Sequence, residues 1–236
     1  MYNPETAKQN ILLTLKTGYI SVDMEGGNLV KDTPVEISAV RYSPDGERLG
    51  SITVVRDKTS LTPRGGAAGM NGKSTFLRDK EITELIDFIG DLPLIGHSIS
   101  THDLPILNYY SKAVRSRGLG NPVIDTYSLA RNLFPRSRYF SLRVLTQELG
   151  IGGLVYHKSE ADCESTSRLY CRLVRKYLDM PEAERDAALH RGLYWGKKTS
   201  GFEESKDGQA ARGALRSPSE QGRPAEDKKA VIHTWL

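Results

Sequence analysis

Two acidic residues, Asp23 and Glu25 in the segment SVDME, are the first candidates for chemistry in this sequence. Residues two apart on a strand project toward the same face, so the two carboxylates would share one side. Because burying both without a counter-charge is costly, we expect them at the end of a strand, where they meet cations. A pair of solvated acids at a strand terminus is the alternative interpretation.

A third acid, Asp103, lies in the segment LIGHSISTHDLPIL, where a loop after a buried strand is expected to enter a helix. Asp is favoured at that place as an N-cap, and capping alone would explain a single residue of this kind. Asp103 becomes a candidate for chemistry because of the other acids in the chain.

The segment HKSEAD places His157 before an expected helix and Asp162 in its first turn. Ser159 and Asp162 also fit a capping box, which would explain this acid without catalysis. Capping does not explain His157. Its offset of five residues from Asp162 allows both side chains to face one cleft, although an incidental surface histidine is the alternative.

Four carboxylates and one imidazole suit a site for two divalent cations that clamp an attacking water and a leaving oxygen. Oxygen ligands favour Mg²⁺ or Mn²⁺. The imidazole would take the proton of the water, since its ordinary pKa of about 6.5 lies near the operating pH.

The ordered set of motifs resembles the DEDDh family of 3′ to 5′ exonucleases, which includes the proofreading epsilon subunit of bacterial DNA polymerase III and stand-alone homologues. The set runs DxE, GHxxxxHD, VIDTYSLAR and HxxxxD, over roughly residues 18 to 178. The resemblance implies that Asp23, Glu25, Asp103 and Asp162 are metal ligands and that these acids and His157 are catalytic. Asp125, in VIDTYSLAR, is interpreted as structural support.

The resemblance also implies contacts to the terminal nucleotide. The residues expected to bind substrate are Met24, Gly26, Gly27, His97, Ser98 and His102. The sequence departs from the family pattern at three places. Gly26 and Gly27 follow the motif Glu where Thr is usual, which removes a hydroxyl but permits close approach of the backbone. Ser98 replaces the usual Asn and His102 the usual Phe, and a packing role is the alternative for His102.

The elements that must position these residues alternate along the chain. Runs rich in Val, Ile and Tyr at 19–25, 35–43 and 49–57 predict strands, and Pro44-Asp45-Gly46 predicts a hairpin. Helical periods and short apolar runs then alternate from residue 79 to residue 177. This order predicts an α/β fold with a mixed five-stranded sheet flanked by helices, and the resemblance implies that the fold is ribonuclease H-like.

The domain organisation follows from these patterns. We expect a leading helix at 1–17, an exonuclease domain at 18–178, a helical extension at 179–197 and a disordered tail at 198–236. The Gly-rich stretch 59–74 is expected to be a long loop near the substrate. The tail ends in AVIHTWL, which is either a docking peptide for a polymerase or replication partner or an incidental apolar terminus.

Composition and charge exclude a fibrous, membrane or wholly disordered protein, since 38% of the 236 residues are hydrophobic and 26% are charged. The net charge of +4 mildly favours a polyanionic partner. Cys163 and Cys171 lie in one expected helix, too far apart for a disulfide. This and the absence of a signal-like or membrane-spanning segment predict a cytoplasmic protein without a membrane partner.

The leading hypothesis is a metal-dependent 3′ to 5′ exonuclease that releases nucleotides from single-stranded DNA, as in proofreading or repair. Trimming of RNA is the alternative activity, because discrimination at the 2′-hydroxyl cannot be recognised in the sequence. A catalytically silent nucleic-acid-binding module of the same fold is the alternative from another class.

Overall fold

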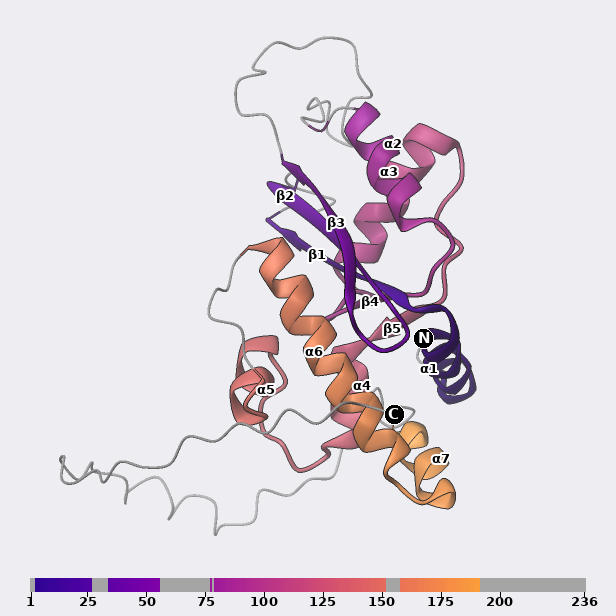
Figure 1. The fold of residues 1–236 in the computed structure, drawn as a ribbon, viewed down its shortest axis with the longest axis vertical. Helices are drawn as coiled ribbons and strands as arrows, with labels where there is room; N and C mark the ends of the chain where they lie inside the picture. The colour runs from indigo at the N-terminus through magenta and orange to yellow at the C-terminus, as the bar shows by residue number, and fades with distance from the viewer. Residues whose placement is uncertain (1–2, 27–33, 56–76, 78, 152–157, 192–236) are drawn as a thin grey trace, which may run out of the picture. The chain divides into compact units, whose positions relative to one another are not determined.

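The structure of the protein is a computed structural model, and the residues it describes form one unit within Met1–Gly196 (Figure 1). The described ranges are 3–26, 34–55, 77, 79–151 and 158–191. Predictions that fall outside them concern Gly27, His157, the expected loop at 59–74 and the expected tail at 198–236. In the described ranges, no helix combines the length and the apolar character that crossing a membrane requires.

Five described strands form one mixed sheet in the order β3-β2-β1-β4-β5. Their bounds are β1 Tyr19–Glu25, β2 Glu36–Tyr42, β3 Arg48–Val55, β4 Leu94–Gly96 and β5 Val123–Asp125. The first three strands are antiparallel, and β4 and β5 run parallel to β1. The β2–β3 hairpin turns at the predicted Pro44-Asp45-Gly46, where the N–H of Gly46 donates to the carbonyl of Ser43. The predicted mixed sheet is confirmed.

Seven helices accompany the sheet among the described residues. Their bounds are α1 Pro4–Thr17, α2 Asp79–Ile89, α3 Asp103–Arg115, α4 Thr126–Leu133, α5 Leu142–Glu148, α6 Ser159–Leu178 and α7 Glu182–His190. Cys163 is buried and Cys171 exposed on α6, and neither forms a disulfide, as expected for two residues on one helix.

The helices cover both faces of the sheet, because alternate strand residues point to opposite sides. Ile20, Val22 and Met24 of β1 pack with α2 and α3 in one apolar cluster. The second cluster joins Tyr19 to residues of α4 and α6. Figure 1 shows α2 and α3 on one side of the sheet and α6 on the other. The strands are therefore fixed between two apolar layers.

Strand β1 is central but only partly paired on one edge. It pairs with β2 along its whole length, whereas it pairs with β4 only at Ile20 and Ser21. Its last residues, including Asp23 and Glu25, therefore extend past the end of β4. Two helices, α3 and α6, begin near this exposed end of β1, and each contributes an acid to it.

Candidate active site

Asp23 and Glu25 lie on the same face of β1, and both are partly exposed while Met24 between them is buried. This alternation follows from the period of two in a strand. Directly opposite them on β2 lie Ser38 and Glu36. The carboxyl end of β1 therefore presents two acids on the face that α6 covers.

Helix α6 brings a third acid to this face. Asp162 lies in the first turn of α6 and is 8% exposed. The hydroxyl of Ser21 in β1 donates to the carbonyl of Cys163 at 2.9 Å, which holds this part of the helix against the strand. Carboxylate oxygens of Asp23, Glu25 and Asp162 lie within 4.8 Å of one another. The structure thus brings together three of the four acids expected to bind metal.

The fourth acid, Asp103, is 3% exposed and is the first residue of α3. His102 takes the N-cap position before it, so the capping alternative for Asp103 does not describe the structure. The carboxylate of Asp103 instead lies close enough to the backbone N–H of Met24 for this N–H to lower its pKa. Asp103 is close enough to Asp23 to raise the pKa of that carboxyl, although it is not one of the three that surround a common point.

Electrostatic repulsion in this group is strong. Burial, reinforced by the negative charges of its acidic neighbours, raises the pKa of Asp23 to about 9. These neighbours are Asp103, Asp162, Glu25 and Glu36. Burial also raises the pKa of Asp103 to about 7, against the opposing effect of its backbone hydrogen bonds. Without a cation, protons would offset part of the repulsion at neutral pH.

The donor set fits hard divalent cations. Carboxylate oxygens are the ligands that Mg²⁺ and Mn²⁺ prefer. A cation between Asp23, Glu25 and Asp162 would replace the protons as the counter-charge to the cluster. The residues present therefore match the predicted cofactor class.

Asp125 is a support for the loop that follows β4. Its carboxylate caps α4 by accepting from the N–H groups of Tyr127 and Ser128. The same carboxylate accepts from the N–H of Ser98 at 3.1 Å and from that of Ser100 at 3.4 Å. These bonds hold Ser98 in the left-handed region, at φ 66°. The structural role predicted for Asp125 is what its contacts provide.

His97, which was expected to bind substrate, has its ring turned into the fold. Its Nε2 lies 2.7 Å from the carbonyl oxygen of Phe140 and its Nδ1 lies 3.0 Å from the hydroxyl of Thr126. Burial lowers the pKa of His97, which favours the neutral ring. Because the carbonyl of Phe140 can only accept, Nε2 is the donor in that bond. Its contacts are structural, and any effect on substrate would pass through the backbone that it supports.

The other residues expected to bind substrate differ in what they expose. His102 is exposed beside Asp103. Gly26 adopts φ 64°, and an added Cβ there would lie 3.1 Å from Cγ2 of Val35, so glycine suits this turn better than the usual Thr. Met24 is 5% exposed and packs in the apolar core, which leaves only its backbone near the acids.

The capping box, which was the alternative explanation of Asp162, does not form at the start of α6. Lys158 is the N-cap and makes no capping bond with its side chain, and Ser159 is the first residue of the helix. The hydroxyl of Ser159 contacts the sheet instead, lying 2.6 Å from Oε1 of Glu36 and 2.6 Å from the hydroxyl of Ser38. The hydroxyl of Ser159 thus makes a tertiary contact with the sheet in place of the local capping bond. Glu36, the partner in this contact, was not among the residues that the sequence predicted for the site.

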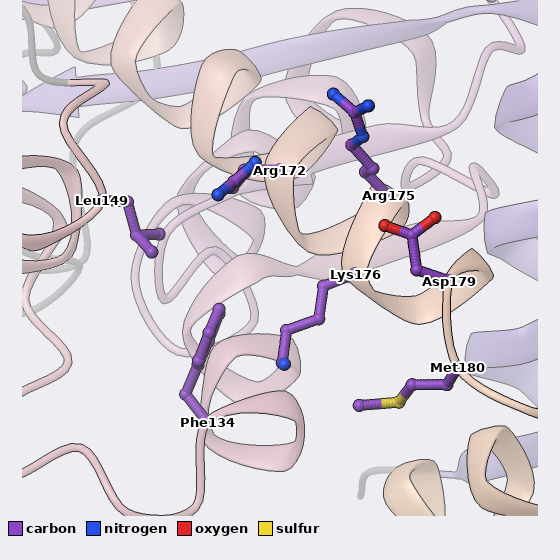
Figure 2. A pocket seen from close by; sticks show the side chains of 7 residues that line it. All are labelled: Phe134, Leu149, Arg172, Arg175, Lys176, Asp179 and Met180. Carbon is purple, nitrogen blue, oxygen red and sulfur yellow. The ribbon is translucent and has the colours of Figure 1, made fainter.

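A separate cavity of about 320 Å³ lies near the other end of α6 (Figure 2). Its lining residues are Phe134, Leu149, Arg172, Arg175, Lys176, Asp179 and Met180. Lys176 packs over the ring of Phe134, with Nζ 5.0 Å from the ring centre. This hollow is mainly basic and apolar, and the α6 residues that line it begin ten residues after Asp162, so it does not contain the acidic cluster.

Comparison with known sequences finds similarity to DNA polymerase III proteins. No family model matches the sequence. The DNA polymerase III subunit epsilon of Aquifex aeolicus is 26% identical over 170 residues, which cover 67% of this chain and 81% of that protein. The PolC-type DNA polymerase III of Latilactobacillus sakei is 30% identical over 165 residues, which cover 67% of this chain and 11% of that protein. The chain spans about a tenth of the PolC-type relatives.

Comparison with solved structures supports the fold. The RNase domain of yeast Pop2 superimposes with a TM-score of 0.53 at 12% identity, covering 84% of this chain and 92% of that one. The E. coli ExoI in a complex with single-stranded DNA gives a TM-score of 0.51 at 16% identity, covering 75% of this chain and 42% of that one. The ribonuclease H-like fold that the family resemblance implies is confirmed.

Proposed function

We propose that this chain, which belongs to the DEDD family of 3′ to 5′ exonucleases, hydrolyses the terminal phosphodiester bond of DNA and prefers single-stranded 3′ ends. The observation that supports this most directly is the acidic cluster at the end of β1, where oxygens of Asp23, Glu25 and Asp162 lie within 4.8 Å of one another. Asp103 stands beside this cluster.

In this proposal the four acids hold two divalent cations, Mg²⁺ or Mn²⁺. When bound, such ions supply activation of a water and neutralisation of charge on the phosphate. Asp23, Glu25 and Asp162 would share one ion, because their oxygens surround a common point. Asp103 would complete the second position from the side of α3.

His157 is the proposed general base, which takes a proton from the attacking water. An imidazole with an ordinary pKa near 6.5 suits that task at neutral pH. Its neighbour Lys158 is the N-cap of α6, and Asp162 follows in the first turn. In the sequence, His157 is therefore one residue before the N-cap of the helix that carries one of the acids.

The terminal nucleotide would be held mainly by backbone groups and by one exposed ring. Gly26 and Gly27 follow β1 in the sequence, and neither has a side chain that could block approach to the acids. Ser98 is fixed by Asp125 in a loop before α3, and His102 is exposed at the start of that helix. We propose that these positions contact the sugar and phosphate, while His97 and Met24 contribute through their backbones.

DNA is the proposed substrate because the sequence relatives are subunits and domains of DNA polymerase III. The same relatives support the proposal that the chain acts with a polymerase or another replication protein, in proofreading or in repair. The tail 198–236 is the proposed segment for docking such a partner. Binding of the purified chain to a replicative polymerase, with and without residues 198–236, tests this part.

The activity is tested by following a 5′-labelled single-stranded DNA oligomer with Mg²⁺ or Mn²⁺, with an EDTA control. Asp162→Ala, His157→Ala and an exposed control, Asp179→Ala, are assayed beside the unmodified chain. A ladder that shortens from the 3′ end, and that is lost with EDTA, Asp162→Ala and His157→Ala only, supports the proposal. Matched RNA and duplex DNA oligomers establish the preference. No cleavage of any oligomer would overturn it.

A further inference from the structure

Glu36, the first residue of β2, lies at the same end of the sheet as the acidic cluster. It is paired directly with Glu25 of β1, so both side chains project from neighbouring points on the face that α6 covers. It is partly exposed and is not among the three acids whose oxygens surround a common point. Its position beside the cluster therefore needs a different explanation.

The contacts of Glu36 are directed to the start of α6. Oε1 of Glu36 accepts from the backbone N–H of Ser159 at 3.0 Å and from the hydroxyl of Ser159 at 2.6 Å. The first N–H groups of a helix have no partner within the helix. A carboxylate from the sheet thus supplies the cap that the side chain of Lys158 does not.

The direction of the neighbouring hydrogen bonds follows from this contact. Because the hydroxyl of Ser159 donates its proton to Glu36, it accepts from the hydroxyl of Ser38, 2.6 Å away. Ser38 in turn accepts from the hydroxyl of Thr53 at 2.8 Å. The hydrogen bonds therefore run from Thr53 on β3 to Ser38 on β2, then to Ser159 on α6. They end on the carboxylate of Glu36.

Ser159 and Asp162 are three residues apart, so they are neighbours on one side of α6. Fixing Ser159 to the sheet therefore fixes the height and rotation of the turn that carries Asp162. The salt bridges from Arg48 to Glu160 and Glu164 also join the sheet to this turn, but they are exposed. Exposed ion pairs contribute little, and Glu36 makes the bonds closest to the acids.

We propose that Glu36 is a positioning residue, which sets Asp162 against Asp23 and Glu25 through its two hydrogen bonds to Ser159 without binding metal itself. This inference rests on the proposed function, since the positioned acid is a proposed metal ligand. What Glu36 supplies is a hydrogen-bond acceptor at a fixed point, and glutamine offers the same acceptor without the charge.

The test compares Glu36→Ala, Glu36→Gln and Ser159→Ala with the matched control Glu47→Ala, which removes an exposed carboxylate from the opposite end of the β2–β3 hairpin. Affinity for Mn²⁺ is measured by calorimetry, and cleavage of a DNA oligomer gives kcat and KM. Amide hydrogen exchange at residues 159–162 in EDTA reports the position of the helix start without metal. Thermal unfolding shows whether each variant folds.

We expect Glu36→Ala to weaken Mn²⁺ binding and lower kcat by about 10- to 100-fold, the usual effect of losing a group that orients a metal ligand. KM should change little. Exchange of the Ser159 amide should become faster. Glu36→Gln should retain most of the affinity and protection, and Glu47→Ala should match the unmodified chain. Ser159→Ala should also weaken Mn²⁺ binding. The double variant Glu36→Ala with Ser159→Ala should lose less affinity than the two single losses together, because both substitutions remove the same contact.

Two results would overturn the inference. If Glu36→Gln is as damaging as Glu36→Ala, the charge matters and not the hydrogen bonds. If Glu36→Ala leaves exchange at residues 159–162 unchanged, the carboxylate does not hold the helix. Failure of the unmodified chain to bind Mn²⁺ or cleave DNA would count against the proposed function instead, and the exchange measurement would still decide the role of Glu36.

Discussion

The carboxylate of Asp103, at the start of α3, lies close enough to the backbone N–H of Met24, near the end of β1, for this N–H to lower the pKa of the acid. Strand β4 pairs with β1 only at Ile20 and Ser21, so it does not reach Met24. The side chain of Asp103 therefore faces a backbone donor that β4 leaves unpaired. Asp103 also raises the pKa of Asp23, so it has both a structural and an electrostatic effect.

These two effects are separable by substitution. Asn at position 103 keeps an oxygen that faces the N–H of Met24 but removes the charge. We expect Asp103→Asn to unfold at or above the temperature of the unmodified chain. The rate of cleavage should fall by more than the roughly 100-fold that is typical of losing a residue that only supports a metal ligand. Asp103→Ala should lose stability as well. Thermal unfolding measures the stability, and single-turnover cleavage measures the loss of activity. Normal cleavage by Asp103→Asn would contradict the proposed role of Asp103 as a metal ligand.

The stability of the metal-free protein should depend on pH through Asp23. The pKa of Asp23 is about 9 in the folded chain, against an ordinary value of 3.8 for an aspartate in an unfolded one. Between these values the folded state binds more protons than the unfolded state, so stability falls as pH rises from about 4 to about 9. Thermal unfolding in EDTA across this range measures the fall.

Two comparisons assign that fall to the acidic cluster. Asp23→Asn should flatten the profile, because the group no longer ionises, and should raise the unfolding temperature at pH 8. Mg²⁺ should also flatten it, since a cation replaces the proton as counter-charge. A profile in EDTA that is identical for Asp23→Asn and the unmodified chain would show that Asp23 is not the cause.

Much of the site could be predicted from short patterns. The segment YISVDME is apolar up to its acids, which marks β1 and places Asp23 and Glu25 on one face by the period of two. The turn signal Pro44-Asp45-Gly46 predicted the hairpin, because such residues favour tight turns. These features depend on neighbours in the sequence, and local rules describe them well.

Glu36 and His97 could not be interpreted in this way, because their partners are distant in sequence. Glu36 contacts Ser159, 123 positions away, and His97 contacts Phe140, 43 positions away. One local signal did exist for Glu36, a charged residue at the start of a strand and on the same face as Ser38. An antiparallel hairpin places it near the end of β1, so register reasoning would have found it.

The ring of His97 should contribute to stability more than to binding. Burial lowers its pKa from 6.5, so on acidification the unfolded state gains a proton that the folded state does not. Stability should therefore fall as pH drops below about 6.5 and should be constant above it, as far as His97 contributes. His97→Ala should cost about 1 to 3 kcal/mol, because the carbonyl of Phe140 loses its donor.

Chemical denaturation of His97→Ala at pH 5 and pH 7.5 measures this cost. The difference in stability between the variant and the unmodified chain should be smaller at pH 5. KM for a DNA oligomer should change less than stability does. A large rise in KM without loss of stability would instead indicate that the side chain of His97 contacts the substrate.

Gly96 ends β4 in close contact with the loop that leads to Asp103. A Cβ added there would lie 2.6 Å from Cβ of Ile99, which is fully buried and cannot move aside. We expect Gly96→Ala to destabilise the fold by about 1 to 3 kcal/mol, the usual cost of overpacking. Cleavage should also fall, because the loop must shift and α3 begins directly after it.

Gly120→Ala is the matched control, since an added Cβ there meets nothing within 4 Å. It should change neither stability nor cleavage measurably. Unfolding in urea and cleavage of a DNA oligomer, measured for both variants, separate a local clash from a general effect of losing glycine. If Gly96→Ala matches Gly120→Ala in both measurements, the loop tolerates a side chain at the end of β4 and its position does not fix Asp103.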